Sequence, residues 1–385
     1  MKFVVTKADL MKKLTLAMGN VSTKNTVPAI EGVLIETIND GRVQITTYDM
    51  QKGLRARITP VEVEREGRYI INAQRLYQTV RVLPDDDITI DISENLGCTI
   101  SCGRSVFSMS ATRGADYPNM PDLVTERGFT VGADNLRRMI SKVTHSIAIS
   151  DNRPMLCGAY FTVNEGGFEV VSCDSFRLSR CSLKCDISTL STEGVNNYSF
   201  IIPGTSLGEM MKILGDGEDE IIKVYLSRKH VIINKGDLTF FSRLIDSEYL
   251  DYKKIIPTAN NIVVKVDRER LLSGLERANI IAEEKIQGAG RSYVKLKIED
   301  HYLFLTSNSA NGAVNDEMDC EHEGGDIDIA FNCRYLIDAI KVAEGEQVLI
   351  RLKSYDSAVT IEPVEESEDF SYFYMVLPRR TNEQR

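Results

Sequence analysis

Apolar residues recur along this chain with two spacings. In six segments they fall at positions i, i+4 and i+7, one face of an α-helix, starting at residues such as Leu10, Leu76 and Leu136. Between these segments, short runs alternate apolar and polar residues, which is typical of half-buried strands in antiparallel sheets. Asn72 and Asn332 stand where side chains cap helix N-termini. The pattern predicts an α+β fold with helices over residues 7–18, 72–83, 134–146, 205–214, 267–283 and 332–343.

The same order of strand, turn and helix occurs in three successive stretches. Phe3, Phe129 and Ile262 open similar strand-to-helix units, and a second unit follows in each stretch, with offsets of 126 to 133 residues. A solenoid repeat spans about 20–50 residues, so this period is instead the size of a small domain. We therefore predict three tandem domains, each with two helices packed on antiparallel sheets, at residues 1–127, 128–257 and 258–385.

Charge is divided unevenly between the predicted helices and the rest of the chain. The formal net charge is −10, but the six helices together carry +6, which leaves −16 elsewhere. Basic helices on an acidic body attract a polyanion to the helical surface. Lys and Arg contacts to phosphates carry no sequence information, and their affinity falls steeply with salt. Joined to the threefold repeat, this distribution favours nucleic acid as a partner.

Neither the cysteines nor the histidines form a recognisable chemical motif. Cys98 and Cys102, like Cys181 and Cys185, are four residues apart on expected strands. That separation is about 13 Å, too far to share a metal ion. None of the four histidines pairs with Ser, Cys or Asp in a nucleophile motif. We therefore expect free thiols and no catalytic residue, metal or cofactor, and the lack of a signal-like N-terminus or a long apolar run predicts a cytoplasmic protein away from membranes.

Short motifs in all three stretches carry a resemblance to a known family. They are TVPAI (26–30), TYD (47–49), FSMS (107–110), CDSFRL (173–178), LDY (250–252), FN (331–332) with Tyr335, and MVLPR (375–379). By their order and spacing, the whole chain resembles the bacterial DNA polymerase III beta subunit, the DNA sliding clamp. The resemblance implies a non-enzymatic processivity factor. Two three-domain chains would close head to tail into a ring that encircles duplex DNA without sequence preference and tethers the replicative polymerase.

The resemblance also implies a pocket between the second and third domains. There the polymerase alpha subunit, the clamp loader, other polymerases and repair proteins would insert a short peptide. A Leu/Phe peptide needs an apolar cleft with a polar rim. Where the family commonly has Gly-His, this chain has Ser175-Phe176, so we expect an altered peptide preference. The matching positions are Leu156, Cys173, Ser175, Phe176, Arg177, Leu178, Leu250, Lys254, Ile255, Asn332, Tyr335, Met375, Val376, Leu377, Pro378 and Arg379.

Two further sets of positions follow from the charge pattern and the resemblance. At the ring joint, Phe107 and Met109 on an edge strand of domain one would meet Ile280 and Ile281 of the partner's domain three. The neutral segment 308–312 predicts an apolar joint there. The positions expected to face DNA are Lys12, Lys13, Lys24, Arg75, Arg81, Arg137, Arg138, Lys142, Ser150, Arg153 and Lys212.

Two alternatives to a replicative clamp remain open from the sequence. One is a paralogue that keeps the ring but serves another set of partners. The other is a three-domain hydrolase with an unrecognised site. Retention on circular DNA with loss from linear DNA separates the clamp from the hydrolase, because only a ring is held topologically.

Overall fold

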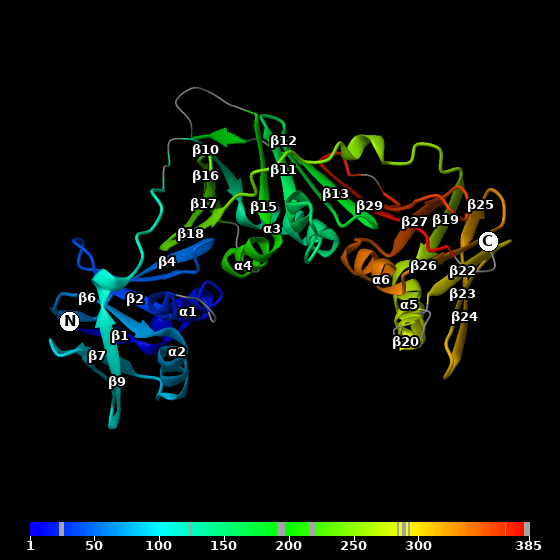
Figure 1. The fold of residues 1–385 in the computed structure, drawn as a ribbon. Helices are drawn as coiled ribbons and strands as arrows, with labels where there is room; N and C mark the ends of the chain where they lie inside the picture. The colour runs from blue at the N-terminus through cyan, green and yellow to red at the C-terminus, as the bar shows by residue number, and fades with distance from the viewer. Residues whose placement is uncertain are drawn as a thin grey trace. The chain divides into compact units, whose positions relative to one another are not determined.

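A computed structural model describes residues 1–22, 27–123, 125, 127–185, 187–190, 197–215, 220–282, 285–286, 290–291, 293–365 and 367–380. These residues form six α-helices and twenty-nine mostly short strands, which confirms the α+β class (Figure 1). The chain divides into two compact units. Unit 1 holds Met1–Leu136, Ser188–Val195 and Thr205–Leu244, and unit 2 holds Arg137–Ile187, Asn196–Gly204 and Ile245–Arg385.

The helices lie where the apolar spacing places them. Both predicted caps are present, because the Asn72 side chain accepts a hydrogen bond from the backbone N–H of Arg75 and Asn332 accepts one from Arg334. The third helix ends earlier than predicted. The Val143 carbonyl accepts a hydrogen bond from the Ser172 hydroxyl, and the chain continues as a 3-10 turn. The bounds are α1 (Lys7–Met18), α2 (Ala73–Val82), α3 (Ala133–Val143), α4 (Gly204–Leu214), α5 (Arg268–Ala282) and α6 (Cys333–Val342).

Unit 1 is built on one fourteen-stranded sheet, in the order β14-β10-β16-β17-β18-β4-β3-β2-β6-β9-β8-β7-β1-β5. Helix α1 packs on β3 and β4 with Leu10, Leu14 and Ala17 buried. Burying a leucine of this kind contributes roughly 1.5–3 kcal/mol. The strands are β1 (Lys2–Thr6), β2 (Gly32–Thr37), β3 (Val43–Tyr48), β4 (Lys52–Ile58), β5 (Glu62–Arg65), β6 (Arg68–Asn72), β7 (Asp87–Ile92), β8 (Gly97–Cys102), β9 (Ser105–Arg113), β10 (Gly128–Gly132), β14 (Ser188–Thr189), β16 (Ile221–Leu226), β17 (His230–Lys235) and β18 (Leu238–Arg243).

Unit 2 contains a nine-stranded sheet, β15-β11-β12-β13-β29-β28-β27-β19-β25, a four-stranded sheet, β24-β23-β22-β26, and the short pair β20-β21. Helices α5 and α6 lie side by side in this unit (Figure 1). The strands are β11 (Gly158–Asn164), β12 (Gly167–Cys173), β13 (Arg177–Lys184), β15 (Tyr198–Pro203), β19 (Ile262–Asp267), β20 (Lys285–Ile286), β21 (Gly290–Arg291), β22 (Val294–Glu299), β23 (Tyr302–Asn308), β24 (Ala313–Asp319), β25 (Glu321–Glu323), β26 (Ile327–Phe331), β27 (Gln347–Leu352), β28 (Val359–Pro363) and β29 (Phe370–Val376).

Equivalent hairpins make the threefold repeat visible in the structure. The hairpins β3–β4, β12–β13 and β23–β24 each close over four residues, at 49–52, 174–177 and 309–312. In the first two loops the second residue is left-handed, with φ of 75° at Met50 and 79° at Ser175. Strands β4, β13 and β24 are therefore equivalent. Hairpins β8–β9 and β17–β18 likewise match, since each turns through two residues that begin with a left-handed glycine, Gly103 or Gly236.

Two of these equivalent strands join successive copies of the repeat. In unit 1, β4 pairs with β18 in the first joint, with Leu54 opposite Phe240. In unit 2, β13 pairs with β29 in the second joint, with Ser179 opposite Tyr374. Both joints are antiparallel and follow the same register. One backbone arrangement thus connects the copies twice within the chain.

Candidate functional site

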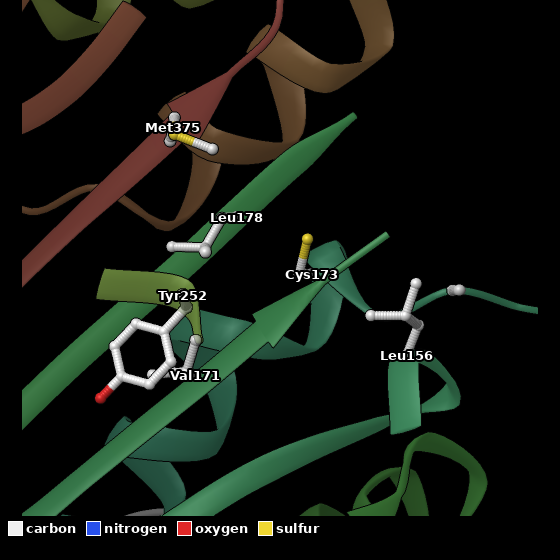
Figure 2. Packing of buried hydrophobic residues seen from close by; sticks show 7 residues of the cluster. Leu156, Val171, Cys173, Leu178, Tyr252 and Met375 are labelled. Atoms are coloured by element: carbon white, nitrogen blue, oxygen red, sulfur yellow. The ribbon is translucent and has the colours of Figure 1, made fainter. Parts of the chain in front are cut away.

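A cluster of seven buried residues lies beside the second joint in unit 2 (Figure 2). Leu156 comes from the 3-10 turn η4 (Pro154–Cys157), and Cys173 ends β12. Leu178, the second residue of β13, sits opposite Met375 of β29. Tyr252 completes the labelled group together with Val171. Burial raises the pKa of the Cys173 thiol, which keeps it in its neutral form. The result is an apolar floor.

Three large apolar side chains at the predicted pocket positions remain exposed at the surface of unit 2. Phe176 is 57 % exposed, Ile255 45 % and Leu377 38 %. The backbone N–H of Leu377 donates to the carbonyl of Phe176 at 2.8 Å, which holds the segment after β29 against the hairpin loop 174–177. Exposed apolar residues beside a buried apolar floor are what a partner-binding cleft requires.

Arg177 is fixed on the polar rim by two carboxylates. Its guanidinium donates to Asp174 and to Asp338, each at 2.8 Å, and lies 4.4 Å from the centre of the Tyr335 ring. The Phe176 ring stacks on the same tyrosine, with centroids 6.3 Å apart. Sequence reasoning missed both carboxylates. The spacing that places Asp338 one helical turn after Tyr335, on the same face of α6, was an available signal.

Ser175 adopts a backbone conformation that normally favours glycine, with φ of 79°. Its hydroxyl accepts a hydrogen bond from Arg153, and Asp151 holds the guanidinium of Arg153 through both of its oxygens. Arg153 was predicted to face DNA. The structure places it beside the loop that carries Phe176, and it therefore belongs to the rim of this cleft.

The other predicted pocket positions all lie in unit 2 as well. Leu250 packs half-buried against the floor, and Lys254 is exposed and pairs with Asp251 at 2.8 Å. That hydrogen bond raises the pKa of Lys254. Val376 is buried and contributes through its pairing with Arg177. The positions that remain are Asn332 as the cap of α6, Pro378 as a half-buried residue, and Arg379, whose guanidinium lies 5.8 Å from the Tyr293 ring.

Lysines of α1 and α4 line a groove of about 630 Å³ in unit 1. Lys12 and Lys13 come from α1, and Lys212, which pairs with Glu209 at 2.9 Å, comes from α4. The groove is also lined by two further lysines and three acids, which are Lys7, Lys235, Asp85, Glu220 and Asp237. Its lining therefore carries a net positive charge. On α2, Arg75 and Arg81 are exposed. Lys24 lies outside the described residues.

The basic residues of α3 differ from the prediction. Lys142 is only 4 % exposed: its ammonium donates to the carbonyl of Val342 and pairs with Glu344 at 2.8 Å. The expectation that Lys142 faces DNA is therefore wrong, because its charge is enclosed by protein. Arg138 is exposed, but its guanidinium donates two hydrogen bonds to the same carboxylate. Arg137 is half-buried, and Ser150 is exposed.

A histidine and a serine do meet in unit 2, but in the interior. His145 Nε2 lies 3.0 Å from the hydroxyl of Ser179, which is fully buried. Burial lowers the pKa of His145 to about 3, so the ring stays neutral at pH 7. Among the described residues there is no group of three or more His, Cys, Asp or Glu side chains able to hold a metal. In the same part of the chain, no helix is both long and apolar enough to cross a bilayer.

The predicted joint residues lie on or near unpaired strand edges. Residues 105–110 of β9 pair with β8, whereas only 111–113 pair with β6, so one edge of the strand is open around Phe107 and Met109. Strand β24 is the outer strand of its sheet. Ile280, 72 % exposed, and Ile281 belong to the last turn of α5. The described edge of β24 also carries acids such as Asp316, so the expectation of an apolar joint is incomplete.

Comparisons with known proteins cover almost the whole chain. Models of the DNA polymerase III beta subunit match as N-terminal domain at residues 1–121, central domain at 130–251 and C-terminal domain at 253–380. A beta sliding clamp of Escherichia coli K12 is 28 % identical over 382 residues, with 99 % of this chain and 100 % of that protein covered.

Solved structures agree with this result. The sliding clamp of Pseudomonas aeruginosa bound to griselimycin has a TM-score of 0.89 at 26 % identity, covering 99 % of this chain and 100 % of that one. The clamp of Bacillus subtilis also has a TM-score of 0.89 at 26 % identity, with 99 % of each chain covered. The chain therefore belongs to the DNA polymerase III beta subunit family, the beta sliding clamps.

Proposed function

We propose that two chains close head to tail into a ring through a third joint of the kind already present twice within each chain. The observation that carries this proposal is the pair of unmatched strands. Strand β24 is equivalent to β4 and β13, and β9 is equivalent to β18, yet neither has the partner that its equivalents have. An open strand edge favours pairing with another chain. Two chains with three copies each supply six copies.

Exposure at the equivalent positions supports this joint. Phe240 in the first joint is fully buried and Tyr374 in the second is 1 % exposed, whereas Phe107 at the same position of β9 is 38 % exposed. The shared register then predicts Phe107 of one chain opposite Val314 of the other. Ile281 at the end of α5 lies near the closing hairpin of β23–β24, since an added Cβ at Gly312 would meet its side chain, and the exposed Ile280 precedes it in the same helical turn.

Sedimentation of the full-length protein tests the joint. The wild type should be a dimer, and Ile280→Asp should produce monomers, because a carboxylate buried in the joint lacks a partner. Ile221→Asp is the matched control, since Ile221 is 71 % exposed on β16, a strand that already pairs with β10 and β17. A monomeric wild type, or a dimer that persists in Ile280→Asp at micromolar concentration, would refute the ring joint.

As a beta sliding clamp, the chain is a non-catalytic processivity factor of a DNA polymerase, and we propose that its ring encircles duplex DNA. The lysine-lined groove between α1 and α4 and the exposed arginines of α2 supply the contact in unit 1. The acidic remainder of the chain repels DNA from other surfaces. Contacts of this kind fix no sequence, which suits movement along the duplex.

Retention on DNA separates encirclement from ordinary binding. Clamp loaded on a nicked circle should remain through gel filtration in high salt, and linearising the circle should release it. Salt screens the lysine contacts but leaves a topological link intact. Equal loss from circular and linear DNA would rule out encirclement. Lys12→Glu should weaken direct DNA binding at low salt without changing the sedimentation of the protein.

We further propose that partner proteins, the polymerase first among them, dock a short peptide in the cleft beside the second joint. A comparison of the two joints supports this site. At the first joint, Tyr48 and Phe241 occupy the positions equivalent to Cys173 and Met375, and their rings fill the space at a centroid distance of 5.6 Å. The thiol of Cys173 and the flexible thioether of Met375 take up less space than these two rings. Clamps of Pseudomonas aeruginosa and Bartonella birtlesii have been solved bound to griselimycin, so relatives of this chain do bind ligands.

Peptide titration tests the cleft. Arg177→Ala removes the group that links the hairpin loop to Asp338, so polymerase-derived peptides ending in Leu-Phe should bind at least tenfold more weakly. The dimer should persist, because Arg177 lies in unit 2 far along the sequence from both strand edges. Arg351→Ala is the control, since Arg351 also pairs with a carboxylate, Glu362, at 3.0 Å. Unchanged affinity in Arg177→Ala would exclude this cleft.

A further inference from the structure

The peptide cleft of this chain carries an aromatic pair at its mouth. We propose that Phe176 makes the cleft selective for partner peptides that place an aromatic ring on its exposed face. This inference rests on the peptide cleft proposed above and specifies the chemistry of its ligand. Phe176 is thereby a specificity-determining residue of the clamp.

Phe176 presents a ring that is supported but largely uncovered. It stacks on Tyr335 with an interplanar angle of 29° and a centroid distance of 6.3 Å, yet 57 % of the residue is exposed. Tyr335 is itself held in place, because the Arg177 guanidinium lies 4.4 Å from its ring and is tied to Asp338 of the same helix. A third ring can therefore extend an ordered stack.

The backbone on both sides of Phe176 is anchored. Its N–H donates to Asp174 at 3.0 Å, and its carbonyl accepts from Leu377 at 2.8 Å. Ser175, directly before it, is held in its left-handed conformation beside Arg153. A residue whose backbone is already ordered loses little conformational freedom when a ligand binds. The ring is thus presented to the ligand in a defined place.

The position is peculiar to the second copy of the repeat. At the equivalent places in the first copy stand Gln51 in the hairpin loop and Ser206 on α4, so no ring pair forms there. The same copy places a buried apolar cluster that includes Leu178 and Met375 next to the hairpin loop that carries Phe176. A peptide that places one apolar side chain on this floor can lay its neighbour against Phe176.

Stacking of a third ring gives the cleft a measurable preference. Aromatic pairs contribute beyond the apolar area that they bury, by an amount worth roughly a two- to tenfold change in affinity. Cyclohexylalanine matches phenylalanine in size but has no π system. The ratio of affinities for peptides ending in Leu-phenylalanine and Leu-cyclohexylalanine therefore isolates the stack from simple burial.

Calorimetric titration of the full-length clamp with these two nine-residue peptides tests the inference. The wild type should bind the phenylalanine peptide about three- to tenfold more tightly than the cyclohexylalanine peptide. In Phe176→Leu the ratio should fall to near one, whatever the absolute affinity, and in Phe176→Tyr it should return. Tyr302→Leu, which removes a 42 % exposed ring on β23 outside the cleft, is the matched control and should keep the wild-type ratio.

The outcomes separate the inference from the function beneath it. Equal ratios in the wild type and Phe176→Leu would overturn the role of Phe176 while leaving the peptide cleft intact. Failure of the wild type to bind either peptide at millimolar concentration would overturn the cleft and the inference with it. A preference for cyclohexylalanine in the wild type would show that burial alone governs the site, and would also refute the stack.

Discussion

Replacing Glu344 with glutamine should destabilise unit 2 selectively, because it removes a carboxylate that two cations share. The ammonium of Lys142, 4 % exposed, lies 2.8 Å from Glu344 and 4.9 Å from the centre of the Tyr372 ring. Arg138 forks onto the same carboxylate while its guanidinium lies 3.7 Å from the Phe370 ring. The cations come from α3 and the acid follows α6, so the cluster connects distant parts of the sequence.

The expected loss of stability follows from the pKa shifts of Glu344 and Lys142. The shift of Glu344 favours its charged form, whereas the shift of Lys142 disfavours its charged form. Burial raises the pKa of Glu344, but hydrogen bonds from Arg138 and Lys142 outweigh it and lower the pKa to about 2, from an ordinary 4.5. A shift of that size corresponds to about 3 kcal/mol, which screening at a 41 % exposed side chain reduces to about 1–2 kcal/mol. Burial lowers the pKa of Lys142, so its charge is a net cost that the carboxylate offsets. Leaving it buried without that partner adds about 1 kcal/mol or more, for a total of roughly 2–3 kcal/mol.

Urea unfolding combined with amide hydrogen exchange measures this effect. Exchange in β29 and in the second half of α3 should accelerate in Glu344→Gln, while exchange in α1 should not change. Lys142→Met combined with Glu344→Gln should return to within about 1 kcal/mol of the wild type, because an apolar chain replaces the unpaired charge. A loss below about 0.5 kcal/mol in Glu344→Gln, or two substitutions that simply add, would refute the reasoning. The carboxylate's contribution is present above pH 4.5 and disappears as the pH falls toward 2.

Two further predictions concern the interior of unit 2. His145 takes up a proton near pH 6.5 in the unfolded chain but only near pH 3 in the folded one, so the free energy of unfolding should fall by about 2 kcal/mol between pH 7 and 5. In urea titrations, His145→Gln should flatten this pH dependence, and an unchanged slope would contradict the prediction. Cys173→Tyr, which copies Tyr48 of the first joint, should weaken peptide binding at least tenfold in a protein that remains dimeric, with about 1–3 kcal/mol of stability lost to overpacking. Full peptide binding in this variant would place the peptide elsewhere.

Local patterns in the sequence predicted the elements of the fold well. The spacing of Leu10, Leu14 and Ala17 on α1 recurs on the other helices, and each of these three side chains is buried. Caps such as Asn72 were also predicted, because a capping side chain bonds to a backbone N–H only a few residues away. These features depend on neighbours within one or two turns, which is why periodicity and residue type suffice.

Pairings between distant residues could not be predicted in this way. Lys142 looks like one more cation on a basic helix, and its burial becomes tolerable only through Glu344 and the Val342 carbonyl, about two hundred residues later. Arg153 was assigned by analogy to DNA, but its neighbour in space is Ser175. The domain boundaries at 127 and 257 remain predictions. Strand pairs such as β4–β18 and β13–β29 connect residues on either side of these points, so the chain divides into two compact units and not into three.

The three joints implied by the repeat have different physical properties, and these suggest how one domain serves three purposes. The first joint is filled by Tyr48 and Phe241, so it is suited only to rigidity. The second has the smaller Cys173 and Met375 at these positions, beside the proposed peptide cleft. Both are formed within one chain, so a connecting segment keeps the paired strands at high effective concentration. The proposed third joint, through Phe107, depends on a second chain and therefore on protein concentration. Opening of a ring to admit DNA should thus occur there, and the peptide cleft, which lies wholly within unit 2, should continue to bind peptide while the ring is open.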